Sequence, residues 1–358
     1  MPAYWKITNR VFDANGIPTG NQGPLQYFVA DQPPYDASLQ GQNQQNNLKV
    51  WQSVTVNDFK QQLITAADQF PPLPHRQNED QSHVTFLIHG YNNGWLDAAK
   101  LYQMVCDSLY SGEDSLGLCI SFDWPSLGSV LDYLPDRAHA EACAGDLATV
   151  FGLLYDWLLQ KQQTAATNPC KAKISVIAHS MGNYVTQKAL ATVWTRKNQP
   201  LLASLINQLV MIAADVDNDL FESTASDGSD GNAMANLTYR ITSLFSGRDA
   251  VLAASAGLKH FGARRLGRSG LAVRPPTGKD NVWDNDCSTF FPANVGAMDI
   301  HSAYFDPQWP VMKLVGDLLC GIDRDVLVAR GETTGNAWPS KLLAASLRNS
   351  FAVKNQSV

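Results

Sequence analysis

Short apolar runs alternate with longer amphipathic stretches between residues 83 and 245. In the short runs nearly every side chain is apolar, which is typical of strands buried on both faces. In the longer stretches apolar residues recur every three or four positions, which predicts helices. The predicted strands are 83–88, 117–122, 173–178, 207–214 and 239–245, and the predicted helices lie around 94–110, 139–162 and 183–196. This order predicts an α/β fold, a mostly parallel sheet of about eight strands with helices on both faces.

Residues before and after this region predict further elements. Residues 4–12 and 25–30 predict a hairpin at a sheet edge, because a turn rich in Gly, Pro and Asn separates them. A helix is expected near 56–68, with Asn57 as its cap. Toward the C-terminus we expect a polar loop at 223–236, a short strand at 281–286 and a helix at 309–322.

Length and composition fit one large globular domain. Of the 358 residues, 45% are hydrophobic and 17% are charged, so the chain can bury a substantial core. We predict a single domain over residues 1–322, with the N-terminal hairpin and inserted loops, and a C-terminal tail over residues 323–358. The net charge of −6 and the isoelectric point near 5.6 provide no basic footprint for nucleic acid and favour a small or uncharged substrate.

The sequence predicts neither a cofactor nor a metal site. The six cysteines lie far apart, without a Cys-x-x-Cys pair, and are interpreted mostly as reduced core residues. Asp215, Asp217 and Asp219 alternate like calcium ligands, but the glycine and glutamate that complete such a loop are missing. No apolar run predicts a membrane-spanning segment, and the N-terminal residues lack a signal-peptide pattern. We therefore expect a cytoplasmic protein, although a mature secreted form would show the same pattern.

A serine stands between a predicted strand and a predicted helix in the stretch KISVIAHSMGNYV, Lys173–Val185. The small residues Ala178 and Gly182 allow a sharp turn that lifts the Ser180 hydroxyl above the carboxyl end of the sheet. This pattern favours a nucleophile on a strand-to-helix elbow, although such an elbow usually begins with glycine rather than alanine. The alternative is that Ser180 only caps the helix. An elbow predicts an outlying backbone angle at Ser180.

A second turn has the sequence FLIHGYNNGW, Phe86–Trp95. Gly90 would allow the backbone N–H of Tyr91 to face the site, while the N–H of Met181 comes from the elbow. Two such donors would form an oxyanion hole and stabilise a tetrahedral intermediate by about 3 kcal/mol each. The alternative is an ordinary turn rich in Gly and Asn.

A nucleophilic serine needs a histidine base, and the base needs an orienting carboxylate. The chain order serine, acid, histidine leaves His260 and His301 as candidate bases, and we favour His301 because it follows the last predicted strand. Asp249 and Asp215 each follow a predicted strand. We favour Asp249 as the acid because the loop after the later strand is the usual position.

Aromatic side chains near these motifs are candidates for an apolar substrate pocket. We predict substrate contacts at Trp95, Trp124, Asp215 and Tyr304, with Trp309 as a further aromatic candidate. The alternative for the aromatic residues is ordinary core packing.

From about Val84 to Gly321 the chain resembles bacterial α/β-hydrolases of a lipase-like family of unknown function, of the serine esterase type. The resemblance depends on eight stretches in order: FLIHGYNN, SFDWPSLGSVLDYLPDRAHA, VIAHSMGN, AADVDNDLF, FSGRDAVL, RLGR, DIHSAY and VGDLLCGI. It implies an α/β-hydrolase fold with Ser180 as nucleophile, His301 as base and Asp249 as its partner. It also implies that Trp124 and Pro125 lie near the active site.

Together these patterns predict a serine hydrolase that cleaves a small-molecule carboxylic ester through an acyl-enzyme. An acyltransferase or an amidase would use the same three residues. The alternative from another class is a binding or scaffold protein on a hydrolase fold, because fold does not determine function. The sequence leaves open the acyl length, the alcohol and the oligomeric state.

Overall fold

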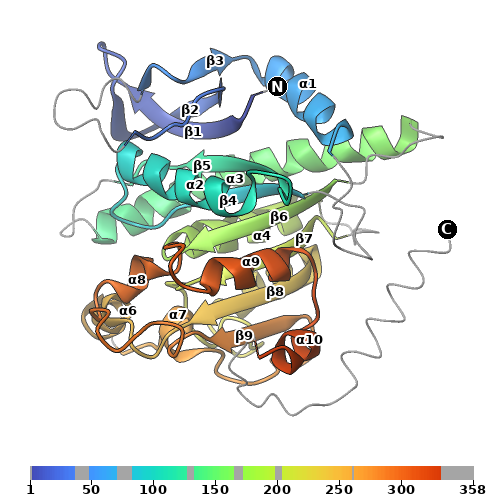
Figure 1. Cartoon of the computed structure of the whole chain (residues 1–358). Coiled ribbons are helices and arrows are strands. Elements are labelled where there is room, and N and C mark those ends of the chain that lie inside the picture. Colours follow the sequence, from blue (N-terminus) through green and yellow to red (C-terminus); the bar gives the residue numbers. More distant parts are fainter. Residues whose placement is uncertain are drawn as a thin grey trace.

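The computed structural model describes residues 2–36, 48–70, 83–126, 133–164, 172–197, 204–259 and 262–331. Within these ranges one nine-stranded sheet has the order β3-β2-β1-β5-β4-β6-β7-β8-β9 (Figure 1). The strands are β1 (Tyr4–Phe12), β2 (Pro18–Ala30), β3 (Gln52–Val54), β4 (His83–Ile88), β5 (Gly117–Asp123), β6 (Lys173–His179), β7 (Ile206–Ile212), β8 (Thr238–Phe245) and β9 (Val282–Asp286). Strand β2 is antiparallel to β1 and β3, and the other neighbouring strands are parallel. The predicted, mostly parallel sheet is confirmed.

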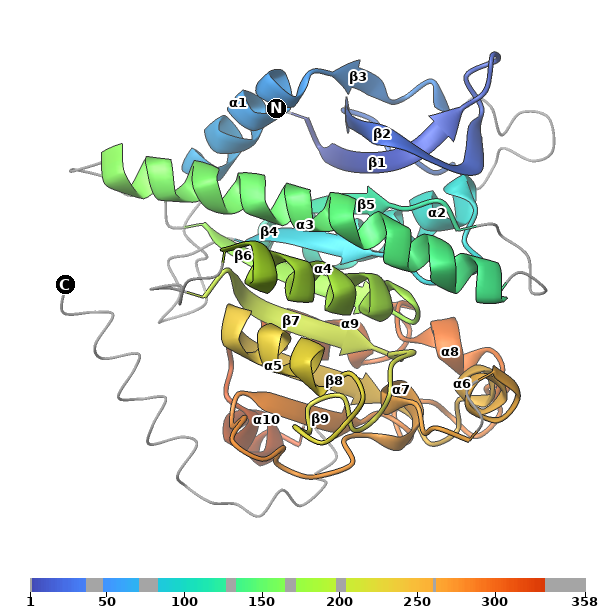
Figure 2. The same cartoon turned by 180° about the vertical axis from the view of Figure 1, so that it is seen from behind.

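Helices cover both faces of the sheet. Helices α2 and α9 lie on one face (Figure 1), and α3, α4 and α5 lie on the other (Figure 2). The helices of the described residues are α1 (Val56–Asp68), α2 (Trp95–Leu109), α3 (Tyr133–Thr164), α4 (Gly182–Lys197), α5 (Gly228–Leu237), α6 (Ala250–Ala254), α7 (Leu266–Ser269), α8 (Ile300–Ala303), α9 (Val311–Leu319) and α10 (Arg324–Ala329), with a π-helical turn at Ser255–Lys259.

The strands separate two hydrophobic clusters, one on each face. Strand β4 shows how, because successive side chains of a strand point to opposite faces. Phe86 and Ile88 pack in the cluster that α3 and α4 cover, and Leu87 packs in the cluster that α2 and α9 cover. The five cysteines of the described residues are buried and unpaired, which confirms their interpretation as reduced core residues; they are Cys106, Cys119, Cys143, Cys287 and Cys320.

Two local predictions were wrong. The cap of α1 is Thr55, whose hydroxyl accepts a hydrogen bond from the Asp58 N–H, and Asn57 lies within the first turn. Residues 223–236 were expected to form a loop, but α5 begins at Gly228. At Gly231 a Cβ atom would lie 2.0 Å from the Leu220 carbonyl oxygen. Only glycine fits so close to the backbone of Leu220. This packing outweighs the low helix propensity of glycine.

The N-terminal hairpin was expected at a sheet edge, and the structure confirms this only in part. Strand β1 lies inside the sheet, since it pairs with β2 on one side and with β5 on the other. Beyond β2, the short strand β3 was not predicted. Polar side chains of β1 can therefore be buried.

The chain is bound to β8 at the predicted start of the C-terminal tail, just before α10 begins. The Arg240 guanidinium donates hydrogen bonds to the carbonyls of Gly321 and Ile322 and pairs with Asp323 at 2.8 Å. Leu327 is buried. The division between residues 1–322 and 323–358 stays a prediction, and residues 332–358 lie outside the described ranges.

Candidate active site

Three side chains from distant parts of the sequence meet at the carboxyl edge of the sheet. Ser180 follows β6, Asp249 follows β8, and His301 lies in α8. The His301 Nε2 atom is 2.9 Å from Ser180 Oγ, and His301 Nδ1 is 2.7 Å from Asp249 Oδ2. Asp249 is fully buried, and Ser180 and His301 are 4% and 8% exposed. Since a carboxylate only accepts, Nδ1–H donates to Asp249, which leaves Nε2 to accept the Ser180 hydroxyl proton.

The backbone of Ser180 has the outlying angle expected of an elbow. Its φ is 51°, in the left-handed region that non-glycine residues seldom adopt. The Ser180 N–H donates to the Ile212 carbonyl at 3.0 Å, and the Asn183 side chain donates to the Ser180 carbonyl at 3.2 Å. These bonds hold the strained residue in place.

Glycine is needed after the serine but not before it. A Cβ atom at Gly182 would lie 2.4 Å from the Ile88 carbonyl oxygen and 2.5 Å from that of His89. Ala178, where glycine is usual, lies in β6 and pairs with Ile88 and Met211. Extended backbone accepts a methyl group, and this one is buried in the core.

The two candidate acids have different partners. Asp249 caps α6, because its Oδ1 accepts the Leu252 N–H at 3.0 Å while Oδ2 holds His301. Asp215 instead accepts the Ser255 hydroxyl at 2.8 Å and lies 3.7 Å from Arg265 Nε. The structure thus brings Asp249, and not Asp215, to His301. The rival base His260 lies outside the described residues.

His179 ties the serine turn to α8, a contact that sequence reasoning missed. Its Nε2–H donates to the His301 carbonyl at 2.9 Å. Burial, with the nearby His301, lowers the pKa of His179 to about 3, so this ring is neutral near pH 7. Its position directly before the serine was the only signal in the sequence, and that position does not reveal the partner.

The predicted oxyanion donors follow the ends of β4 and β6. Gly90 lies against the serine turn, because a Cβ atom there would be 2.9 Å from Ser180 Cβ. Tyr91 follows Gly90, and the buried Met181 precedes the first residue of α4. Tyr91 therefore follows a residue that lies against Ser180, and Met181 follows Ser180 itself. The role of their backbone N–H groups as oxyanion donors stays a prediction.

The aromatic residues predicted as substrate contacts are buried side chains. Trp95 is 7% exposed, and Lys6 Nζ lies 3.4 Å from its ring centroid. Trp124 stacks on the His89 ring, and Tyr304 packs edge-on against Phe291. Trp309 is partly buried in the core. The packing matches the alternative of ordinary core, and substrate contact stays a prediction for these residues and for Asp215.

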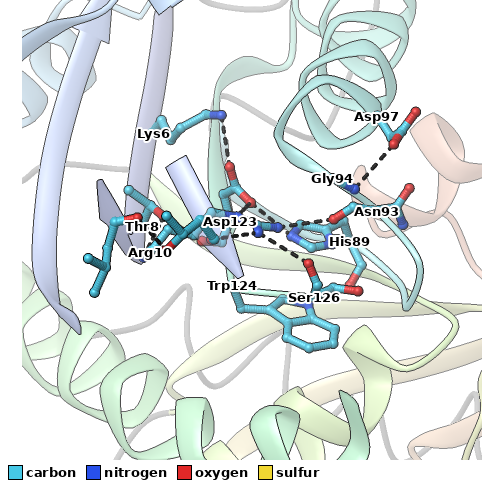
Figure 3. A network of polar contacts seen from close by, with 12 residues as sticks. Lys6, Thr8, Arg10, His89, Asn93, Gly94, Asp97, Asp123, Trp124 and Ser126 are labelled. Atoms are coloured by element: carbon cyan, nitrogen blue, oxygen red, sulfur yellow. Dashed lines mark hydrogen bonds and ion pairs between the residues drawn. The ribbon is translucent and has the colours of Figure 1, made fainter. Parts of the chain in front are cut away.

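A cluster of buried charges next to the predicted oxyanion turn was also missed. Lys6, Arg10 and His89 converge on the Asp123 carboxylate (Figure 3). Burial alone would raise the pKa of Asp123, but the charges of Arg10 and Lys6 outweigh it and hold the pKa well below its usual value. Lys6, Thr8 and Arg10 alternate along a predicted edge strand, and such a row of polar side chains suggests a solvated face. Only the order of the strands buries them.

Two further properties concern the described residues alone. In these ranges no group of three or more His, Cys, Asp and Glu side chains is placed to hold a metal ion. No helix in the described part of the chain is long and apolar enough to span a membrane.

A mostly parallel sheet with helices on both faces, and a serine on a sharp strand-to-helix turn, define the α/β-hydrolase class. The family model described as "Alpha/beta hydrolase of unknown function (DUF900)" matches residues 72–284, more than half of the chain. The protein belongs to this family.

Individual proteins share less with this chain. An uncharacterized protein of Nostoc sp. (strain PCC 7120) is 26% identical over 145 residues, and the match spans 35% of this chain and 35% of that relative's length. A crystal structure described as that of a cell surface hydrolase from Lactobacillus plantarum WCFS1 is 10% identical, with a TM-score of 0.36. That match covers 71% of this chain and 99% of the other.

Proposed function

We propose that the protein is a serine hydrolase that cleaves an uncharged carboxylic ester through an acyl-enzyme. The observation that carries the proposal is the continuous hydrogen-bonded series from Ser180 Oγ through the His301 ring to Asp249. Each member has the chemistry that its position needs. The serine hydroxyl becomes a good nucleophile only when a base takes its proton, and the imidazole is that base. The buried carboxylate orients the imidazole.

The proposed reaction has two halves. Ser180 Oγ attacks the ester carbonyl carbon while its proton moves to His301 Nε2, and the backbone N–H groups of Tyr91 and Met181 hold the resulting oxyanion. When the tetrahedral intermediate collapses, the alcohol leaves with the proton from His301. Water then attacks the acyl-enzyme in the same way, which releases the carboxylic acid and restores Ser180.

Two other functions use the same geometry. An amidase or an acyltransferase differs only in the leaving group or the acceptor. A binding protein on a hydrolase fold needs no reactive serine, whereas Ser180 here has both a strained backbone and a base at 2.9 Å. A maintained strain of this kind favours catalysis over scaffolding.

Labelling with a fluorophosphonate, followed by peptide mapping, tests the nucleophile directly. We expect the label on Ser180 in the wild-type protein. Ser180→Ala should abolish labelling and lower ester hydrolysis by at least about 10⁴-fold. Ser108→Ala is the matched control, because Ser108 is an exposed α2 residue whose hydroxyl donates within its own helix. Equal labelling of wild-type and Ser180→Ala protein would rule out Ser180 as the nucleophile.

A panel of p-nitrophenyl esters and anilides of increasing acyl length tests the substrate class. Ester turnover that exceeds anilide turnover supports an esterase. Efficient anilide turnover supports an amidase instead. Labelling together with release of only about one equivalent of p-nitrophenol per protein supports acyl transfer to an acceptor other than water. No labelling and no turnover would support the binding-protein alternative.

A further inference from the structure

The N-terminal hairpin supplies two buried cations that lie outside the part of the chain matched by the family model. Lys6 and Arg10 belong to β1, and the match begins at residue 72. Lys6 is fully buried and Arg10 is 2% exposed. Burying two cations is costly unless each makes several good contacts, so their contacts identify what they stabilise.

Both cations hold the carboxylate of Asp123 at the end of β5. Lys6 Nζ is 3.0 Å from Asp123 Oδ2, and Arg10 Nε is 2.9 Å from Oδ1 (Figure 3). Thr8, between them on β1, donates its hydroxyl to the Asp123 carbonyl at 2.6 Å. Asp123 is therefore fixed from the hairpin side in both its side chain and its backbone.

Arg10 also bridges the two turns at the carboxyl edge of the sheet. Its Nη1 donates to the Ser126 carbonyl at 3.2 Å, after β5. Its Nη2 donates to the Asn93 carbonyl at 3.0 Å, after β4. The planar guanidinium can hold the carboxylate and both carbonyls together, which a lysine ammonium cannot do.

His89 extends the series to the turn next to Ser180. Both ring nitrogens face oxygen acceptors, so both donate: Nε2–H to Asp123 Oδ1 at 3.1 Å and Nδ1–H to the Gly90 carbonyl at 2.8 Å. The Asn93 side chain donates to the same carbonyl at 3.1 Å. Trp124 stacks on the His89 ring and donates to the His89 carbonyl at 2.9 Å. The Gly90 carbonyl is therefore held by two donors.

The orientation of the Gly90 carbonyl determines that of the Tyr91 N–H. The two groups belong to one planar trans peptide, so they point in opposite directions. Two donors on the carbonyl therefore keep the N–H directed to the other side. An oxyanion donor contributes most when it is oriented before the reaction, because no reorganisation is then needed.

We propose that Lys6 and Arg10 are positioning residues for the peptide between Gly90 and Tyr91, acting through Asp123, His89 and Asn93. This inference depends on the proposed function, in which the Tyr91 N–H binds the oxyanion. The hairpin then orients an oxyanion donor in addition to extending the sheet.

The test compares Arg10→Met with Arg240→Met. Arg240 is a matched control, because it is 3% exposed and also bridges two backbone carbonyls and a carboxylate. Its acceptors belong to the residues just before α10 and not to the turns beside Ser180. We expect Arg10→Met to lower kcat by about 10- to 100-fold with KM within about twofold, since oxyanion bonds strengthen in the transition state. Arg240→Met should keep kcat within about twofold even if it lowers Tm equally.

Arg10→Lys covers the case in which Arg10→Met fails to fold. It keeps the positive charge near Asp123 and loses the bonds to Asn93 and Ser126, so we expect at least about a fivefold fall in kcat. Hydrogen exchange of the peptide 89–95 adds a measurement that needs no activity. It should be at least about fivefold faster in the Arg10 variants and unchanged in Arg240→Met.

The outcomes separate the two proposals. Arg10 variants that match Arg240→Met in kcat and in exchange at residues 89–95 would overturn the inference. A wild-type protein that neither takes up the fluorophosphonate nor cleaves esters would overturn the proposed function. In that case the exchange at residues 89–95 still decides whether the hairpin orders this turn.

Discussion

Close backbone contact at Gly182 holds the serine turn against the turn after β4. A Cβ atom at this position would meet the carbonyl oxygens of Ile88 and His89, which are backbone atoms and cannot rotate away. Gly90 has the reciprocal role, since a Cβ atom there would meet Ser180 and His179. The two turns therefore approach as closely as they do only because neither glycine has a side chain.

Gly182→Ala should destabilise the protein by about 1–3 kcal/mol, because the turns must separate to admit the methyl group. Gly152→Ala is the control. Gly152 lies in α3, and a Cβ atom there meets nothing within 4 Å, so alanine should stabilise by about 0.5–1 kcal/mol through its helix propensity. Denaturant unfolding of both variants measures the difference. Equal unfolding midpoints for wild-type and Gly182→Ala protein would contradict the steric argument.

His179 should make folding stability depend on pH below neutrality. Burial, followed by the charge of His301, lowers its pKa from 6.5 to about 3. Between these two pH values the His179 ring is protonated in the unfolded chain but not in the folded chain. Stability is then complete above pH 6.5 and falls as the pH drops toward 3, by up to about 1.4 kcal/mol per pH unit.

His179→Gln should remove this contribution, because an amide N–H can still donate to the His301 carbonyl but does not titrate. The free energy of unfolding, measured from pH 7 to 4.5, should fall less steeply in the variant than in the wild type. Parallel curves for the two proteins would show that His179 does not contribute to the pH dependence.

At the scale of single elements, the first turn of α1 shows how local chemistry sets a boundary. The Thr55 hydroxyl accepts the Asp58 N–H at 3.1 Å and donates to the Asp58 carboxylate at 2.7 Å. One of the N–H groups that a helix start leaves without a partner is thus satisfied. Asn57 is an equally good capping residue type, but it lies two residues too late.

Thr55→Ala should cost about 1 kcal/mol of stability through the lost cap, whereas Asn57→Ala should change stability by no more than about 0.5 kcal/mol. Both side chains are exposed at the start of α1, so the pair isolates capping from core packing. Urea unfolding of the two variants provides the comparison. A larger loss from Asn57→Ala than from Thr55→Ala would reverse the assignment of the cap.

Strand β1 shows that an element's neighbours decide what its side chains do. Its register places Thr8 opposite Asp123 of β5, and β2 covers its other edge. Lys6 and Arg10 are therefore buried against Asp123 instead of facing solvent. The same strand at a true edge would have had a solvated charged face.

On the scale of the whole molecule, the sheet order brings the candidate active site together. Ser180, Asp249 and His301 are distant in sequence. The parallel strands β6 and β8 place Ser180 and Asp249 at their carboxyl ends, on the same side of the sheet. Ligands of such sheets bind at the carboxyl ends of the strands, so the location agrees with the fold. The opposite end of β8 carries Arg240, which contacts the chain before α10.

Two shortened chains test the predicted boundary after residue 322. A chain that ends at Ile322 loses the Asp323 partner of Arg240 and the buried Leu327, and one that ends at Gly331 keeps both. Because burial of one leucine side chain contributes about 1.5–3 kcal/mol, the shorter chain should have the lower Tm. Identical Tm values would support a domain that ends at residue 322.

The sequence by itself determined the α/β class and the position of most strands and helices. It also determined the elbow at Ser180, including its outlying backbone angle. These features are local, since periodicity, small residues and turn chemistry involve positions that are close along the chain. They could be predicted without knowing which strands become neighbours.

Only the tertiary structure decided the contacts between distant positions. It brought Asp249 rather than Asp215 to His301, directed His179 to the His301 carbonyl, and buried Lys6 and Arg10 on Asp123. It also made a helix of the glycine-rich start of α5. The contacts of Asp249, His179, Lys6 and Arg10 depend on the order and register of strands, which a pattern along one chain does not specify. The start of α5 depends on the close packing of Gly231 against Leu220.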